Sequence, residues 1–133
     1  SILLTKLPHI DAYIDRRREI AKIYDKELAD TGLILPYAAD YGKHAYYLYV
    51  VRHPKRDVIM QKLKENNIFV NISYPWPIHT MTGYQYLGYM EGDLPETEAA
   101  AKEIFSLPMY PSLEDKEVMY VCDTLKKILS EIE

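Results

Sequence analysis

The sequence has a single cysteine in 133 residues, which excludes a disulfide framework and a cluster of metal-bound thiolates. No run approaches the roughly 18 apolar residues of a membrane span, and no signal-peptide pattern opens the chain. Sixteen basic and twenty acidic side chains give a net charge of −4, without the positive field typical of nucleic-acid binding. We therefore expect a cytoplasmic protein whose partners include neither a membrane nor a nucleic acid.

The short motifs of common enzymes are also missing. The sequence contains no glycine-rich loop for a dinucleotide or a nucleoside triphosphate, no Gly-x-Ser-x-Gly turn and no His-Glu-x-x-His pair. The one thiol, Cys122, lies on an apolar helical stripe, which favours a buried structural role over a nucleophile. The residues alone therefore indicate no catalytic constellation and no metal site.

What is present is the composition of one globular domain, with 48% hydrophobic and 27% charged residues. Helical spacing and capping residues predict helices over 9–30, 57–65 and 95–104, and a last one that follows a capping box of Ser112 and Asp115. Aromatic and β-branched runs predict strands over 45–52 and 68–72, and the prolines in 106–111 predict an extended edge segment. This alternation predicts the α/β class, as a two-layer α+β domain.

Charge is distributed unevenly along the chain. Residues 1–67 carry a net charge of +3, and residues 68–133 carry −7. Such imbalances usually reflect solvated helix faces. The alternative is a basic surface in the first half that meets an anionic ligand.

Tyrosine is the compositional anomaly, with thirteen copies against two phenylalanines and one tryptophan. Several fall in residues 73–92, a segment rich in proline and glycine with no clear periodicity, which predicts an ordered binding loop. Its turn Tyr74-Pro75-Trp76-Pro77-Ile78-His79 presents two aromatic rings and an imidazole, and its prolines lower the entropy cost of ordering. The alternative is that Tyr74 and Trp76 plug the end of the domain, with His79 hydrogen-bonded beneath them.

Several segments occur together in a recognisable order. They are Leu7-Pro8-His9-Ile10-Asp11, the run from His44 to Arg52, the turn from Tyr74 to His79, Leu87-Gly88-Tyr89 and the stretch from Ser106 to Pro111. In this order they resemble the C-terminal domain of the DegT/DnrJ/StrS-type aminotransferases. These are enzymes of fold type I that depend on pyridoxal phosphate (PLP) and act mostly on nucleotide-linked keto-sugars.

The resemblance implies that residues 1–133 form one small C-terminal domain, in which residues 1–8 are the remnant of an interdomain helix. The large PLP-binding domain, which carries the Schiff-base lysine, would lie outside the chain. The complete enzyme would transfer an amino group from glutamate to a keto-sugar, with PLP supplying the carbanion chemistry. The chain alone would be inactive and would bind no PLP.

The resemblance also implies which residues and partners take part. Tyr74 and His79 are the candidate substrate-binding residues, and no residue is assigned to catalysis, cofactor binding or metal binding. The implied partners are the large domain, a nucleotide-sugar substrate and further copies of the chain, since apolar residues of the N-terminal helix would otherwise face water. The second hypothesis is a free-standing binding or interaction module without enzyme activity.

Overall fold

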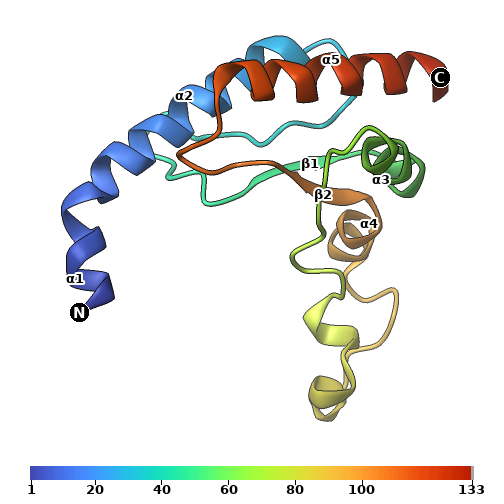
Figure 1. The fold of residues 1–133 in the computed structure, drawn as a ribbon. Coiled ribbons are helices and arrows are strands. Elements are labelled where there is room, and N and C mark those ends of the chain that lie inside the picture. The colour runs from blue at the N-terminus through green and yellow to red at the C-terminus, as the bar shows by residue number, and fades with distance from the viewer. Residues whose placement is uncertain (133) are drawn as a thin grey trace.

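The computed structural model describes residues 1–132. Its α-helices are α1 (Ile2–Lys6), α2 (Ile10–Leu28), α3 (Arg56–Glu65), α4 (Pro95–Glu103) and α5 (Asp115–Ile132), and its strands are β1 (Tyr49–Arg52) and β2 (Ile104–Leu107). Three 3₁₀ helices complete the list: η1 (Leu7–His9), η2 (Ile78–Thr80) and η3 (Thr82–Leu87). Helices α2 and α5 form one layer above the sheet and α3 (Figure 1). The prediction of a two-layer α+β domain is confirmed.

Helix α2 confirms the helix predicted over 9–30 and shows how far the core extends. Its second half buries Ile20, Tyr24 and Leu28, whereas Ile10 at its start is exposed. The helix ends at Leu28, and Gly32 follows with a φ of +75°, a conformation that glycine adopts without a steric penalty. The apolar side of α2 is therefore covered only in its second half by the described chain.

The sheet has two antiparallel strands, with Tyr49 opposite Leu107 in its register. Strand β1 is shorter than the predicted 45–52 because Tyr46 has a φ of +45° and donates its N–H to Nδ1 of His44 at 2.9 Å. Such a left-handed residue interrupts an extended strand. The extended segment predicted over 106–111 begins earlier, as β2, and ends before Pro108.

The strand predicted over 68–72 is wrong. Only Asn71 pairs with the sheet, through an isolated bridge to Ser106. The chain leaves α3 through the left-handed residue Asn67, and the N–H of Ile68 donates to the Leu63 carbonyl at 2.9 Å. This pattern closes a helix C-terminus, so the Ile68 amide is not free for a β-ladder.

The capping box predicted from Ser112 and Asp115 is also wrong. Helix α5 begins at Asp115, and the N–H of Glu114 donates to the carboxylate of Glu117 at 2.9 Å. The reciprocal contact of a capping box therefore lies two residues further on, where Glu114 precedes the first helical residue. The apolar stripe predicted on this helix is confirmed, because Ile132 is partly buried and its other members are buried: Val118, Val121, Cys122, Leu125, Ile128 and Leu129.

The centre of the core contains tyrosines. Tyr24 and Tyr49 are fully buried, with ring centroids 4.9 Å apart. The Tyr24 hydroxyl donates to the Pro108 carbonyl at 2.9 Å, and the Tyr49 hydroxyl donates to the Asp25 carboxylate at 2.5 Å. Burial raises the pKa of both phenols far above the ordinary value. Part of the tyrosine excess therefore serves core packing, and the hydroxyls of both buried tyrosines are hydrogen-bonded.

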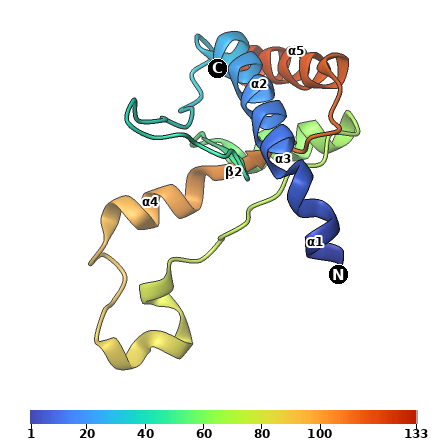
Figure 2. The ribbon, with the colours of Figure 1, turned by 90° about the vertical axis from the view of Figure 1, so that its left-hand side faces the viewer.

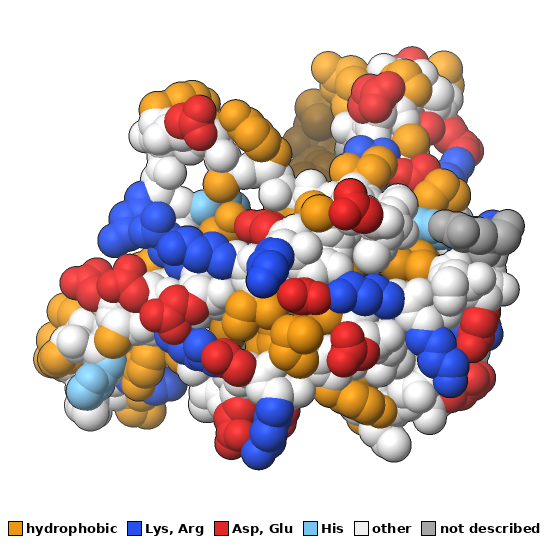
Figure 3. Space-filling view, turned by 90° about the horizontal axis from the view of Figure 1, so that it is seen from above, with side chains coloured by type: hydrophobic (Ala, Val, Ile, Leu, Met, Phe, Trp, Pro, Cys, Tyr) orange, Lys and Arg blue, Asp and Glu red, His pale blue; other side chains and the backbone are white. Residues whose placement is uncertain are grey.

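Ion pairs join helices that are distant in sequence. Arg16 of α2 contacts Asp115 of α5 at 2.6 Å, and Lys126 of α5 contacts Glu27 of α2 at 2.6 Å. Seen from above, the face over these helices mixes acidic and basic side chains (Figure 3). Exposed pairs of this kind contribute little stability. They agree with the interpretation of the uneven charge as solvated helix faces.

Candidate substrate-binding site

Residues 73–94 form an arm that projects away from the layer of α2 and α5 in both ribbon views (Figures 1 and 2). The arm contains η2 and η3 and returns to the body at the start of α4. His79 is its one buried residue, and most of its large apolar side chains are exposed. A segment that buries no apolar side chain must owe its order to polar contacts and turn geometry.

Short-range turns shape the arm. The backbone N–H and the hydroxyl of Thr80 both donate to the Pro77 carbonyl, at 3.1 and 3.0 Å. Helix η3 ends at Leu87, and the next residue, Gly88, has a φ of +79°, which glycine adopts without a steric penalty, while its N–H donates to the Gln85 carbonyl at 3.0 Å. The glycines and prolines of this segment therefore encode specific turns, as expected of an ordered loop.

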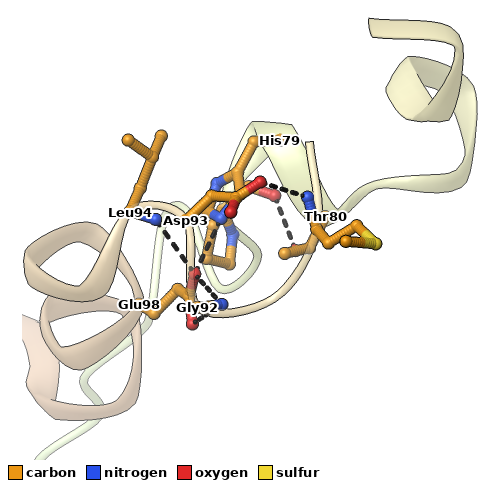
Figure 4. Close-up of polar contacts among 8 residues, drawn as sticks. His79, Thr80, Gly92, Asp93, Leu94 and Glu98 are labelled. Atoms are coloured by element: carbon orange, nitrogen blue, oxygen red, sulfur yellow. Dashed lines mark hydrogen bonds and ion pairs between the residues drawn. The ribbon is translucent and has the colours of Figure 1, made fainter. Parts of the chain in front are cut away.

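One carboxylate ties the arm to α4 (Figure 4). Glu98 accepts a hydrogen bond from Nε2 of His79 at 2.9 Å, and its two oxygens accept the Gly92 N–H at 2.8 and 3.0 Å. The N–H of Leu94 lies 3.4 Å from the same carboxylate. The side chains of His79 and Glu98 are only 6% and 12% exposed. This carboxylate therefore joins the first half of the arm, its last turn and the start of α4.

These contacts determine the charge state of the pair. The hydrogen bond from His79 and, after it, the one from Gly92 lower the pKa of Glu98 below the ordinary value for glutamate. Glu98 is therefore ionised at neutral pH and acts only as an acceptor. The proton in the contact accordingly belongs to Nε2 of His79.

Beside this pair lies a surface hollow of about 470 Å³. Its lining residues are His79, Thr80, Gln85, Gly88, Tyr89, Met90 and Glu91. They supply an imidazole, a hydroxyl, a carboxamide and an aromatic ring, which are groups that hydrogen-bond and stack on polar ligands. Residues 73–94 include no lysine or arginine, so the arm offers no cationic side chain to a phosphate.

The two predicted site residues, Tyr74 and His79, lie in different environments. Tyr74 is 73% exposed and His79 is buried, and no hydrogen bond or ring contact within residues 1–132 joins them. Trp76 is 69% exposed, so the alternative in which Tyr74 and Trp76 plug the end of the domain is wrong. The same alternative also expected a hydrogen bond on His79, and the structure shows one, to Glu98.

Sequence reasoning missed Glu98 as a member of this site. The sequence places it only within the helix predicted over 95–104. Nineteen positions separate it from His79, and no local pattern links the two. Only the path of the arm brings them together.

The described residues contain neither a helix long and apolar enough to cross a membrane nor a group of histidine, cysteine and acidic side chains able to hold a metal ion. Cys122 is buried, as predicted from its position on the stripe.

Residues 1–126 match the DegT/DnrJ/EryC1/StrS aminotransferase family. The chain is 48% identical, over 97% of its length, to the dTDP-3-amino-3,4,6-trideoxy-alpha-D-glucose transaminase of Micromonospora megalomicea subsp. nigra. That match covers 36% of the relative, so the chain spans about a third of the length of the curated relatives it matches.

Solved structures give the same result. The chain superposes with a TM-score of 0.94 on S. venezuelae DesV in complex with a ketimine intermediate, at 30% identity, covering 99% of this chain and 36% of that one. It also resembles the PLP-form of Spr1654, a putative sugar aminotransferase from Streptococcus pneumoniae, with a TM-score of 0.86 and 25% identity, covering 98% of this chain and 34% of that one. The fold therefore matches about a third of the fold of these proteins. The chain belongs to the DegT/DnrJ/EryC1/StrS aminotransferase family.

The family is PLP-dependent. PLP needs a lysine for its Schiff base and donors or cations for its phosphate. The hollow beside His79 has no lysine or arginine in its lining, and no lysine of residues 1–132 is buried. The hollow therefore does not fit PLP by itself, and no chemical step is assigned to it.

Proposed function

We propose that this chain is the small C-terminal domain of an aminotransferase that acts on dTDP-linked keto-sugars, and that it works only together with a large PLP-binding domain. The observation that carries the proposal is the 48% identity over 97% of the chain to a dTDP-sugar transaminase of which it spans only 36%. In this assignment residues 1–133 are one domain, and residues 1–8 belong to the connection between the two domains.

The N-terminal helices expose apolar side chains, which supports the proposal that a partner domain covers this face. Ile2, Leu3, Leu4 and Leu7 are all largely exposed, and Leu3 reaches 81%. A row of apolar side chains of this kind is usually covered by a partner. We assign this face to the large domain of the same enzyme. In its absence we expect the chain to self-associate, and light scattering over a concentration series would measure this. A strict monomer at high concentration would contradict the assignment.

The arm is the substrate side of this proposal. Tyr74 and Trp76 offer exposed rings, and His79 lines the hollow. Aromatic rings stack on sugar and base faces, whereas a diphosphate is bound by cations or by backbone N–H groups. Because the arm has no lysine or arginine, we assign it to the sugar or the base and assign the diphosphate to the large domain.

A chimera tests the proposal. The matching 36% of the Micromonospora relative is replaced by this chain, and the product is assayed for glutamate-dependent amination of a dTDP-linked keto-sugar. We expect transaminase activity from the chimera and none from this chain alone, with or without added PLP. The matched variants are Tyr74→Ala on the arm and Tyr37→Ala, a tyrosine that is also largely exposed and lies far from Tyr74 in sequence.

The outcomes separate the parts of the proposal. Activity that Tyr74→Ala lowers and Tyr37→Ala leaves unchanged supports both the domain assignment and the substrate side. A folded chimera that binds PLP but does not transaminate would overturn the domain assignment. Equal effects of the two variants would remove Tyr74 from the substrate site. Schiff-base absorbance from this chain alone would contradict the need for a large domain.

A further inference from the structure

We infer that Glu98 is a positioning residue, which fixes the orientation and the tautomer of His79 so that Nδ1 of the imidazole is presented to the substrate as a hydrogen-bond acceptor. This inference rests on the proposed function, because it takes the arm as the sugar side of the site. It adds a residue that the sequence does not suggest, and it states which chemical group of the ligand His79 meets.

The geometry gives Glu98 control over the ring. The imidazole and the carboxylate are both nearly buried and 2.9 Å apart, so the contact is shielded from competing water. Glu98 is itself held by the Gly92 N–H on both oxygens, so the carboxylate has little freedom to turn. Since an ionised carboxylate only accepts, the neutral imidazole must carry its proton on Nε2. Its other nitrogen, Nδ1, is then an acceptor.

The second nitrogen is free for a ligand. Within residues 1–132 no side chain or backbone group hydrogen-bonds to Nδ1 of His79. No buried side-chain nitrogen or oxygen in this part of the chain lacks a partner, so Nδ1 must reach solvent. The hollow that His79 lines is formed by residues of η2, of η3 and of the segment 88–91 that follows η3. A buried ring that is fixed on one edge and open on the other is suited to directional recognition.

The class of ligand follows from the lone pair and the charges. An acceptor nitrogen selects a donor, which in a sugar nucleotide is a sugar hydroxyl or the imide N–H of the base. Glu91 is an acidic residue in the lining of the hollow, and residues 73–94 include no lysine or arginine, so a phosphate oxygen is disfavoured there. We assign the partner of Nδ1 to a hydroxyl of the dTDP-linked sugar.

The tautomer is measured by nitrogen-15 NMR of the His79 ring in the full chain at about pH 9, where histidine is ordinarily neutral. We expect Nε2–H alone in the parent chain, and a mixture of both tautomers in Glu98→Ala. Glu98→Gln should retain Nε2–H, because the oxygen that contacts His79 is kept as a carbonyl. Glu96→Ala is the matched control, since it removes an exposed carboxylate from the same helix turn.

These results decide the role of Glu98 without any ligand. A parent chain with the proton on Nδ1, or a Glu98→Ala chain with the parent tautomer, would overturn the inference. Loss of the tautomer in Glu98→Gln as well would show that charge, not hydrogen-bond position, holds the ring, and would also overturn it. Circular dichroism of each variant establishes that the chain is folded.

Titration of the chimera, whose large domain can bind the diphosphate, with dTDP-glucose and, separately, with dTDP then tests the ligand class. We expect dTDP-glucose to shift the Nδ1 resonance and dTDP to leave it unchanged. Affinity for dTDP-glucose should fall roughly tenfold in Glu98→Ala and stay constant in Glu96→Ala. Equal shifts with both compounds would overturn the assignment to a sugar hydroxyl. No shift with either would overturn the substrate contact in the proposed function, while the tautomer data would still judge Glu98 independently.

Discussion

The carboxylate of Glu98 accepts a hydrogen bond from Nε2 of His79 at 2.9 Å, and the same carboxylate accepts the backbone N–H of Gly92. One side chain on α4 therefore joins the first half of the arm to its last turn (Figure 4), and the large apolar side chains of the arm are mostly exposed. Local order in the arm depends on a polar contact, whereas the body depends on apolar packing. The two parts should accordingly respond to different substitutions.

Replacing Glu98 by alanine should loosen the arm and leave the body intact. We expect amide hydrogen exchange over residues 78–92 to accelerate by roughly tenfold, because the arm has no buried apolar side chain to keep it closed. Exchange in α2 and α5 should not change. Hydrogen-exchange mass spectrometry of Glu98→Ala and Glu96→Ala measures this. Equal exchange in the two variants would show that Glu98 does not hold the arm.

Acid should release the same contact. The pKa of Glu98 is lowered from 4.5 by its hydrogen bonds to His79 and Gly92. A carboxyl group with a depressed folded pKa contributes stability above its unfolded pKa and loses it as the pH falls through the folded pKa. The Gly92 amide resonance should therefore follow the protonation of Glu98 with a midpoint below 4.5. A midpoint above that value would contradict the contact, and Glu98→Gln should abolish the transition.

The hydroxyl of Tyr49 should contribute measurable stability to the body. Tyr49→Phe removes the hydrogen bond to the Asp25 carboxylate without leaving a cavity, and we expect a loss of about 1–2 kcal/mol in the free energy of unfolding. The control is Tyr47→Phe, whose ring is exposed, and it should cost less than about 0.5 kcal/mol. Urea denaturation measures both. A loss in Tyr49→Phe no larger than in the control would mean that solvent replaces the bond.

The thiol of Cys122 should resist modification in the folded chain. Burial on α5 raises the pKa of Cys122 to about 12, and the thiolate is the reactive form. Reaction with a chromogenic disulfide at about pH 8 should be slower than in denaturant by roughly a hundredfold or more. The rate in guanidinium chloride is the internal reference. Rapid reaction of the folded chain would show that the α5 stripe opens easily.

Much of the fold could be predicted from local pattern. The stripe on α5, the long helix α2 and the helix end at Asn66 and Asn67 follow from helical spacing and from residues that cap or break helices. The strand predicted over 68–72 failed because an apolar β-branched run does not show where its N–H groups go. In this chain the Ile68 amide closes α3 instead.

For the site, too, the sequence predicted some features and not others. The aromatic turn and His79 were visible as a motif, because prolines and rings in an aperiodic segment are rare and specific. The sequence did not predict the environments of these side chains. Tyr74 and Trp76 are exposed, and His79 is buried against a carboxylate. The partner of a side chain across a loop has no periodicity to reveal it.

By itself the sequence determined the class, the helices and the family, because periodic apolar positions, caps and an ordered set of motifs are properties of the chain as a string. Only the tertiary structure decided which tyrosines pack the core, where α5 begins and that Glu98 holds His79. Those outcomes depend on which residues meet after distant segments fold against one another, and local propensity does not encode such meetings.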